Sequence, residues 1–113
     1  MVKKSINNIK ISTTSHGIGA KRVLLKHEET KTDITQIALT KFKSGEEVEP
    51  HSHKTMEEFF YMLTGKVIIE ADEVKHECTA GDFIQLKANE MHGLQIIEDT
   101  EMIAIGCGVK SLI

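Results

Sequence analysis

The sequence predicts an all-β fold, a sandwich or barrel with little or no helix. Apolar and polar residues alternate in short segments, and turn-forming residues separate these segments about every six to twelve residues. No segment has the apolar period of about 3.6 residues that marks an amphipathic helix. The 113 residues are enough for one hydrophobic core and too few for two, so we expect a single domain over residues 1–113.

The N-terminal part predicts three strands, at residues 6–12, 22–28 and 32–42. The third strand carries large apolar side chains on both of its faces. We expect one face to line the interior and the other to pack against a second subunit. Strands within residues 1–28 would also be free to pair with that subunit, because an unpaired strand edge favours association. The sequence therefore predicts a homodimer.

The middle of the chain predicts a turn at residues 43–45 and a hairpin at Thr64 and Gly65. The hairpin would join a strand at 58–63 to a return strand at 66–71. Pro50, the only proline, restrains the backbone just before two histidines.

The C-terminal part predicts short strands at 74–79 and 83–86, with turns at 72–73, 80–82 and 88–90. A final hairpin is expected from strands at 92–97 and 100–109, with its turn at Glu98 and Asp99.

Composition excludes several classes of protein. The net charge is −3 and the lysines are scattered, which does not suggest a nucleic-acid partner. The longest apolar stretch, 102–109, is too short to span a bilayer, and no apolar run follows the N-terminal lysines, so we expect neither a membrane segment nor a secretory signal. Two cysteines make no disulfide framework, which favours a cytoplasmic location.

The candidate metal ligands lie after Pro50. His51 and His53 are two residues apart, so in an extended chain their side chains project from the same face. Glu58 follows five residues later, and His92 lies far along the chain, where a closed β fold could bring it alongside. Imidazoles converging with a carboxylate suit a divalent transition metal, Mn, Fe, Co, Ni or Zn.

These residues resemble the first motif of the cupin family, which here covers residues 45–65. The matching positions are Gly45, five residues, His51, one residue, His53, four residues, Glu58, six residues and Gly65. The match is close at every one of these positions.

The second cupin motif, residues 81–96, is matched in part. Gly81 and His92 are in place, but Lys87 stands where the family usually has proline and Ile96 where it has asparagine. Asn89 replaces a glycine, which is a mild change because asparagine tolerates the left-handed conformation.

The resemblance implies a single-domain cupin jelly-roll barrel, also called a double-stranded β-helix. It implies a divalent transition metal held by His51, His53, Glu58 and His92, and a small-molecule substrate or ligand. Cupins include dioxygenases, decarboxylases and sugar isomerases, so the resemblance indicates fold and metal better than reaction.

Other residues compete for roles in the site. Glu57 is an alternative ligand, but strand parity and the spacing to Gly65 favour Glu58 and leave Glu57 facing solvent. His16, His27 and His76 have no partner at ligand spacing and are expected at the surface or lightly buried.

Four residues are candidates for the substrate pocket: Gln36, Phe60, Met62 and Cys107. Phe60 and Met62 are expected to fill the barrel wall, with substrate contact as the alternative. Gln36 lies either inside, where its amide needs a partner such as water, substrate or a ligand histidine, or at an exposed edge. Cys107 faces either the pocket or the opposite side, and Cys78 is expected in the core.

Two functions from different classes fit these residues. The first is a metal-dependent enzyme on a small oxygenated molecule, either an oxidoreductase of dioxygenase type or a sugar or keto-acid isomerase. No dedicated acid–base pair is evident, so a metal-bound water would have to serve. The second is a non-catalytic module that binds or senses a small ligand through the metal; in a third reading the metal only fastens strands together. The single arginine, Arg22, disfavours a sugar-phosphate substrate.

Overall fold

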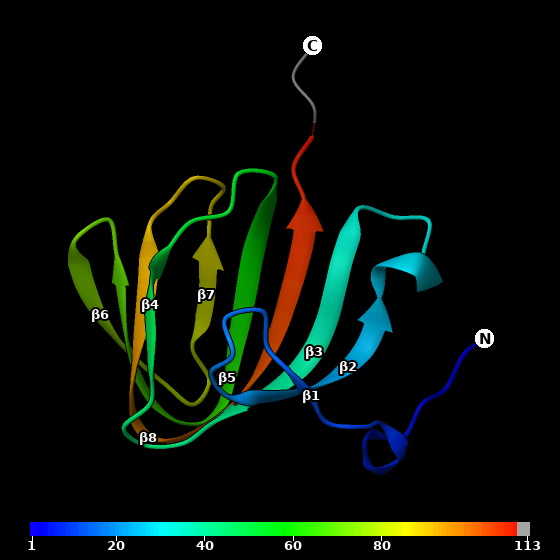
Figure 1. Ribbon diagram of the computed structural model, residues 1–113, viewed down its shortest axis with the longest axis horizontal. Coiled ribbons are helices and arrows are strands. Elements are labelled where there is room, and N and C mark those ends of the chain that lie inside the picture. Colours follow the sequence, from blue (N-terminus) through cyan, green and yellow to red (C-terminus); the bar gives the residue numbers. More distant parts are fainter. Residues whose placement is uncertain (111–113) are drawn as a thin grey trace.

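Two long antiparallel strands, β5 (Met56–Ala71) and β8 (His92–Gly108), form the frame of the fold. The computed structural model describes residues 1–110 (Figure 1). β5 and β8 pair with each other along their whole length, from Met56 opposite Gly108 to Ala71 opposite His92. Each of the other strands is hydrogen-bonded to one half of β5 or β8, either directly or through a neighbouring strand.

The remaining elements are short. They are η1 (Ile6–Asn8), β1 (Ser12–Thr13), β2 (Ala20–Lys26), η2 (His27–Glu29), β3 (Ile34–Phe42), β4 (Glu47–His51), β6 (Val74–Thr79) and β7 (Phe83–Leu86), where η1 and η2 are single 3-10 turns. β1, β2 and β3 continue the sheet beyond the second half of β8, while β7 pairs with the first half of β5. β4 pairs with the first half of β8, and β6 with the second half of β5.

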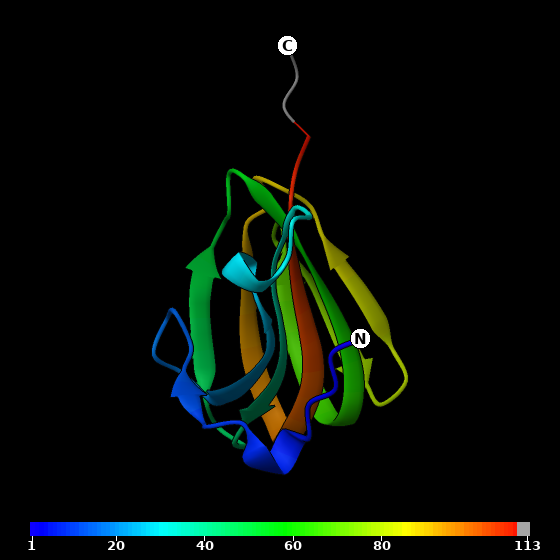
Figure 2. The same ribbon diagram turned by 90° about the vertical axis from the view of Figure 1, so that its right-hand side faces the viewer.

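The eight strands are hydrogen-bonded into one continuous sheet that folds over into two layers. The first layer, here called the first sheet, contains β1, β2, β3, β7, the first half of β5 and the second half of β8, and the second sheet contains β4, β6 and the other halves of β5 and β8. In Figure 1 the orange first half of β8 runs near β4, and its red second half runs beside β3. The two views together show the strands curving round one interior (Figures 1 and 2). This is an antiparallel jelly roll, and the expectation of an all-β fold is confirmed.

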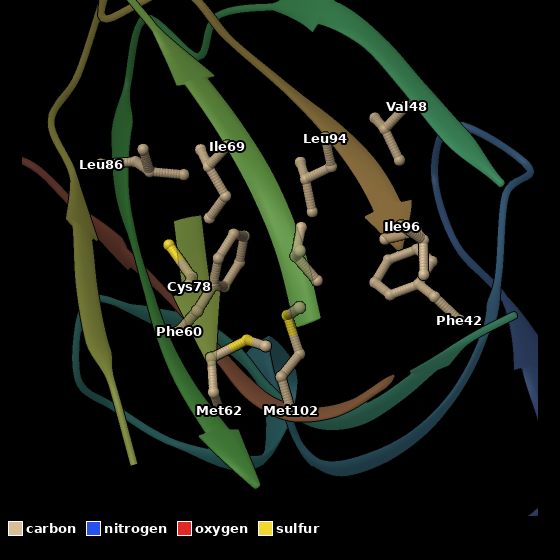
Figure 3. Close-up of a cluster of buried hydrophobic side chains, with 11 residues drawn as sticks. Phe42, Val48, Phe60, Met62, Ile69, Cys78, Leu86, Leu94, Ile96 and Met102 are labelled. Carbon is tan, nitrogen blue, oxygen red and sulfur yellow. The ribbon is translucent and has the colours of Figure 1, made fainter. Parts of the chain in front are cut away.

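The interior is filled by apolar side chains from both sheets (Figure 3). Met62 and Met102, which face each other across β5 and β8, are 0% and 1% exposed. Phe60 and Met62 thus belong to the core wall, as expected, and so does Cys78. The cluster comprises Phe42, Val48, Phe60, Met62, Val67, Ile69, Cys78, Leu86, Leu94, Ile96 and Met102.

The expected hairpin at Gly65 is wrong. β5 continues through it, and the register against β8 shifts between Met62 and Val67, so the chain bends there without reversing. Gly65 has φ of 92°, and a Cβ at this position would overlap the side chain of Thr100 and the carbonyl of Asp99. The glycine is needed for a close approach of two strands rather than for a turn.

The expected hairpin at Glu98 and Asp99 is also wrong, because β8 continues through both residues. Asp99 instead accepts a hydrogen bond from the backbone N–H of Ser44 (2.9 Å), and the Ser44 hydroxyl donates to the carbonyl of Ile97 (2.8 Å). The polar groups that suggested a turn are used to hold the loop before β4.

The N-terminal strand expected at residues 6–12 is replaced by η1 and the two-residue β1. Side chains hold the backbone here: Arg22 Nε donates to the carbonyl of Ile9 (3.1 Å), and Lys4 Nζ donates to that of Leu24 (2.8 Å). The short strands are better predicted, since β6 and β7 have the expected bounds. Within residues 1–110 no helix is long or apolar enough to cross a membrane.

Candidate metal centre

The four predicted ligands meet at one point. His51 is the last residue of β4, His53 lies just beyond it, Glu58 is near the start of β5, and His92 is the first residue of β8. One donor atom from each side chain lies within 4.8 Å of the others. Glu58 comes from one sheet and His51 and His92 from the other, so the cluster joins the two sheets.

Backbone carbonyls orient two of the imidazoles. Nδ1 of His51 lies 2.8 Å from the carbonyl oxygen of Glu49, and Nδ1 of His92 lies 3.0 Å from that of Glu90. A carbonyl only accepts, so each Nδ1 carries the hydrogen and donates it. In the neutral ring this leaves the lone pair on Nε2, which is the atom available to a metal.

Glu58 is the only carboxylate of the cluster. Its Oε1 lies 2.5 Å from Nε2 of His53 and 3.6 Å from Nε2 of His92. Burial acts to raise the pKa of Glu58, but the interaction with His92 and the charges of His53 and His51 outweigh it, so this pKa is lowered. Burial likewise acts to lower the pKa of His92, and the Glu58 carboxylate together with the Glu90 carbonyl raises it above its ordinary value.

This donor set fits a divalent transition metal. Three neutral nitrogens and one carboxylate suit Mn, Fe, Co, Ni or Zn, and they leave one positive charge on the ion. Metal–ligand bonds of about 2.1 Å put neighbouring ligand atoms about 3.0 Å apart, and the four donor atoms here lie within 4.8 Å of one another. His53 and Glu58, at hydrogen-bond distance, would need to part by about half an ångström, and the more distant donor atoms would need to approach one another.

Glu57 does not belong to the cluster. Its Oε1 accepts a hydrogen bond from Nε2 of Gln85 (2.8 Å) on the outer face of the sheet. Strand parity therefore distinguishes Glu58 from Glu57 as expected.

A cavity of about 120 Å³ adjoins the four ligands. Phe60, Leu94, Met102 and Ala104 supply apolar walls, whereas Met62 lies deeper in the core and does not line it. A cavity of about 150 Å³ can hold a benzene molecule, so this one admits a molecule of similar size or slightly smaller.

Cys107 does not line this cavity, and its assignment to the pocket is wrong. In the pairing of β5 with β8, Glu58 is opposite Gly106 and Glu57 is opposite Cys107. Paired residues share a face, so Cys107 lies on the outer side with Glu57. The small residues Ala104 and Gly106 face inward.

Gln36 lies at the cavity, as one of the two sequence interpretations required. Its Oε1 accepts a hydrogen bond from Nζ of Lys21 (2.8 Å). The amide thus has a protein partner that the sequence analysis did not name. Lys21 was missed because the expected strand began at residue 22, whereas β2 begins at Ala20 and includes Lys21.

His16 is exposed, as expected, and its side chain also lines the mouth of the cavity, which was not expected. Its ring lies 6.1 Å from that of His51 and stacks on Phe42 at 6.3 Å between centroids. Burial and then the charge of His51 lower the pKa of His16. No ligand spacing could have found it, because a loop and not a strand places it.

Hydrogen bonds fix the orientation of the His16 ring. The backbone N–H of Ile18 donates to Nδ1 (3.2 Å), so Nδ1 holds the lone pair and Nε2 carries the hydrogen of the neutral ring. The Thr14 hydroxyl lies 3.0 Å from Nδ1 of His16 and 2.6 Å from the carbonyl oxygen of Ile18, and its single hydrogen can serve either acceptor within the same loop.

The second motif reaches the cluster through Asn89. Its φ of 68° is left-handed, as expected for a residue in place of glycine. Its backbone N–H donates to the carbonyl of His53 (2.7 Å), so the loop before His92 is bound to the loop of the first motif.

Comparisons with known proteins agree with this description. The family model described as a cupin domain matches residues 38–106. No curated protein matches the chain.

Solved structures match over nearly the whole chain. A predicted oxalate decarboxylase from Thermotoga maritima is similar with a TM-score of 0.84 and 21% identity, covering 96% of this chain and 100% of that one. Ectoine synthase from P. lautus gives 0.83 and 21%, covering 98% and 80%. An RmlC-like cupin from Shewanella frigidimarina gives 0.78 and 18%, covering 96% and 91%. The jelly roll, the two motifs and the family match together show that the chain belongs to the cupin family.

Proposed function

We propose that this cupin is a metal-dependent enzyme that acts on a small oxygenated organic molecule. The observation that carries the proposal is the cavity beside the cluster of His51, His53, Glu58 and His92. A metal that only fastened strands together would need no such space. When bound, a divalent metal would supply Lewis-acid chemistry to a substrate oxygen.

The chain's own residues prepare this site. The carbonyls of Glu49 and Glu90 hold two imidazoles in the tautomer that presents Nε2. Glu58 supplies the one negative charge of the ligand set. The apolar walls formed by Phe60 and Met102 offer water no hydrogen-bond partner on one side of the cavity, which favours strong electrostatic interactions within it.

His16 supplies a hydrogen-bond donor that is independent of the four ligands. Because its Nδ1 accepts from Ile18, the neutral ring presents Nε2–H as the available group. A substrate oxygen near His16 would accept this hydrogen bond. The site thus offers an oriented donor in addition to the four ligand side chains.

Two similar structures bear enzyme names, the predicted oxalate decarboxylase and ectoine synthase. At 21% identity this likeness extends to the fold. The likeness supports an enzymatic role, because two proteins with this jelly roll are named as enzymes. It does not indicate which substrate this chain would take.

The test begins with elemental analysis of protein purified without added metal. The metal-loaded protein is then screened for turnover of small diketones, enols and sugar acids, with and without oxygen. Oxygen uptake would indicate a dioxygenase, and turnover without oxygen and with zinc would indicate isomerisation or hydration. Reversible binding without turnover would instead favour the binding module, and a protein that takes up no metal would refute the proposal.

A further inference from the structure

Lys21 points into the cavity from β2. It is paired with Thr40 of β3, which is 6% exposed, and both residues line the cavity. The Lys21 Nζ reaches Oε1 of Gln36 at 2.8 Å. A lysine placed on the inner face of a sheet is unusual, because its charge must be compensated there.

The ammonium group of Lys21 is hydrogen-bonded to a neutral side chain and not to a carboxylate. The partner of Lys21 is a neutral amide, and the ion pairs among residues 1–110 do not include Lys21. Among residues 1–110, Glu58 is the one acidic residue that lines the cavity, and it is engaged with His53. An ammonium group can donate three hydrogen bonds, and Gln36 uses one of them.

The register places Gln36 and Glu58 two strands apart on the inner face of the sheet. Both oppose Gly106 of β8, Gln36 from β3 and Glu58 from β5. Two strand spacings of about 4.8 Å separate their backbones by about 10 Å. The ligand cluster and the Lys21–Gln36 pair therefore line the same cavity at positions about two strands apart.

We propose that Lys21 and Gln36 bind a carboxylate, so that the substrate is a small organic acid. Its carboxylate would accept from Lys21 Nζ and from the Gln36 amide nitrogen, while a second oxygen function faces the four ligands. The substrate-class part of this inference rests on the proposed function. The cavity volume limits the acid to roughly the size of benzene.

The test is calorimetric titration of the metal-loaded protein with malonate, succinate and glutarate, each compared with its monoamide. The monoamide keeps the shape and loses one charge. At least one diacid is expected to bind tenfold or more tightly than its monoamide, since hydrogen bonds to charged groups are the stronger ones. Lys21→Met should abolish this preference, and Lys21→Arg should retain part of it.

Lys41→Met is the matched control. Lys41 is also on a strand of this sheet but is exposed and paired with Glu101 (3.1 Å), so its loss should leave diacid binding unchanged. Metal content is measured for every variant. Because neither lysine is a ligand, all variants should retain the metal.

Four outcomes would overturn the assignment: no diacid binding, no preference over the monoamide, equal diacid binding by Lys21→Met at full metal occupancy, or equally Lys21-dependent binding of inorganic phosphate. The last would make the pair a general anion site. Failure of the proposed function has a different signature. In that case neither the wild type nor any variant would take up metal. The same titrations on the metal-free protein would still show diacid binding that depends on Lys21.

Discussion

His51 and His92 are partners in the ladder between β4 and β8, and the centroids of their rings lie 4.5 Å apart. Each ring donates its Nδ1–H to the carbonyl two residues before it. The same local device thus occurs on two neighbouring strands and turns both Nε2 atoms toward Glu58.

Removal of a ligand histidine should abolish metal binding and leave the fold. His51→Ala and His92→Ala are each expected to lose stoichiometric metal, with the β-sheet circular dichroism spectrum largely retained. Both residues lie at strand ends, outside the hydrophobic cluster. Full metal occupancy in either variant would contradict the ligand assignment.

The two adjacent glutamates offer a matched pair of variants. Glu58→Gln should weaken metal binding by more than about 100-fold, because even outer-shell partners of metal ligands are worth 10–100-fold. Glu57→Gln should change it little, since Glu57 only contacts Gln85 on the outer face. Competition titration against a chromophoric chelator measures the metal affinity of both variants. Equal losses of affinity would contradict the assignment of Glu58, and not Glu57, as the ligand.

The interaction of Glu58 with His92 should make the stability of the metal-free protein depend on pH. The pKa of His92 is raised above 6.5, so its contribution is complete below pH 6.5 and is lost as pH rises through the raised pKa. The pKa of Glu58 is lowered below 4.5, so its contribution is present above pH 4.5 and is lost at lower pH. The pair therefore stabilises most between about pH 4.5 and 6.5.

Urea unfolding with a chelator present tests this window. The difference in free energy of unfolding between wild type and His92→Gln should be smaller at pH 8 than at pH 5.5. With metal added the trend should reverse, because metal and proton compete for Nε2 of His92. A difference that grows with pH in the metal-free protein would contradict the prediction.

The bend of β5 at Gly65 predicts a large effect of a single methyl group. Gly65→Ala meets both a left-handed φ and the backbone of Thr100 and Asp99, and should cost about 2–5 kcal/mol of stability. Gly45→Ala is the control, because Gly45 has φ of 90° but open space around it, so about 1–2 kcal/mol is expected. Equal losses in chemical denaturation would show that strand contact at Gly65 is unimportant.

The outer face of the first sheet supports the proposed homodimer. Leu25, Ile37, Ile105 and Phe59 lie side by side across β2, β3, β8 and β5. A continuous apolar row on an outer face favours association of two copies. We expect light scattering to give twice the chain mass for the wild type and the chain mass for Ile105→Glu.

Val74→Glu serves as the control for this variant. Val74 is 56% exposed at the start of β6, away from the row, and its replacement should leave the dimer intact. A wild-type protein that remains a monomer at every concentration would end the proposal.

The short strands could be predicted because turn-forming residues in the local sequence mark where each one begins and ends. Asp72 and Glu73 adopt left-handed φ of 47° and 69°, so the turn before β6 lies where the two polar residues stand. The bend at Gly65 could not be predicted, because the local sequence fits two different structures. A glycine at positive φ marks a reversal and a close approach equally well, and only the pairing of β5 with β8 decides between them.

The candidate site likewise has a part that the local sequence predicted and a part that it did not. The spacing of His51, His53 and Glu58, with the alternation that separates Glu58 from Glu57, was enough to predict the ligand cluster, because residues on one short segment keep their relative directions whatever surrounds them. The positions of Lys21 and His16, and the outward face of Cys107, were decided only by the tertiary structure. They depend on the register between strands distant in sequence and on the path of a loop, and packing of the whole core sets both.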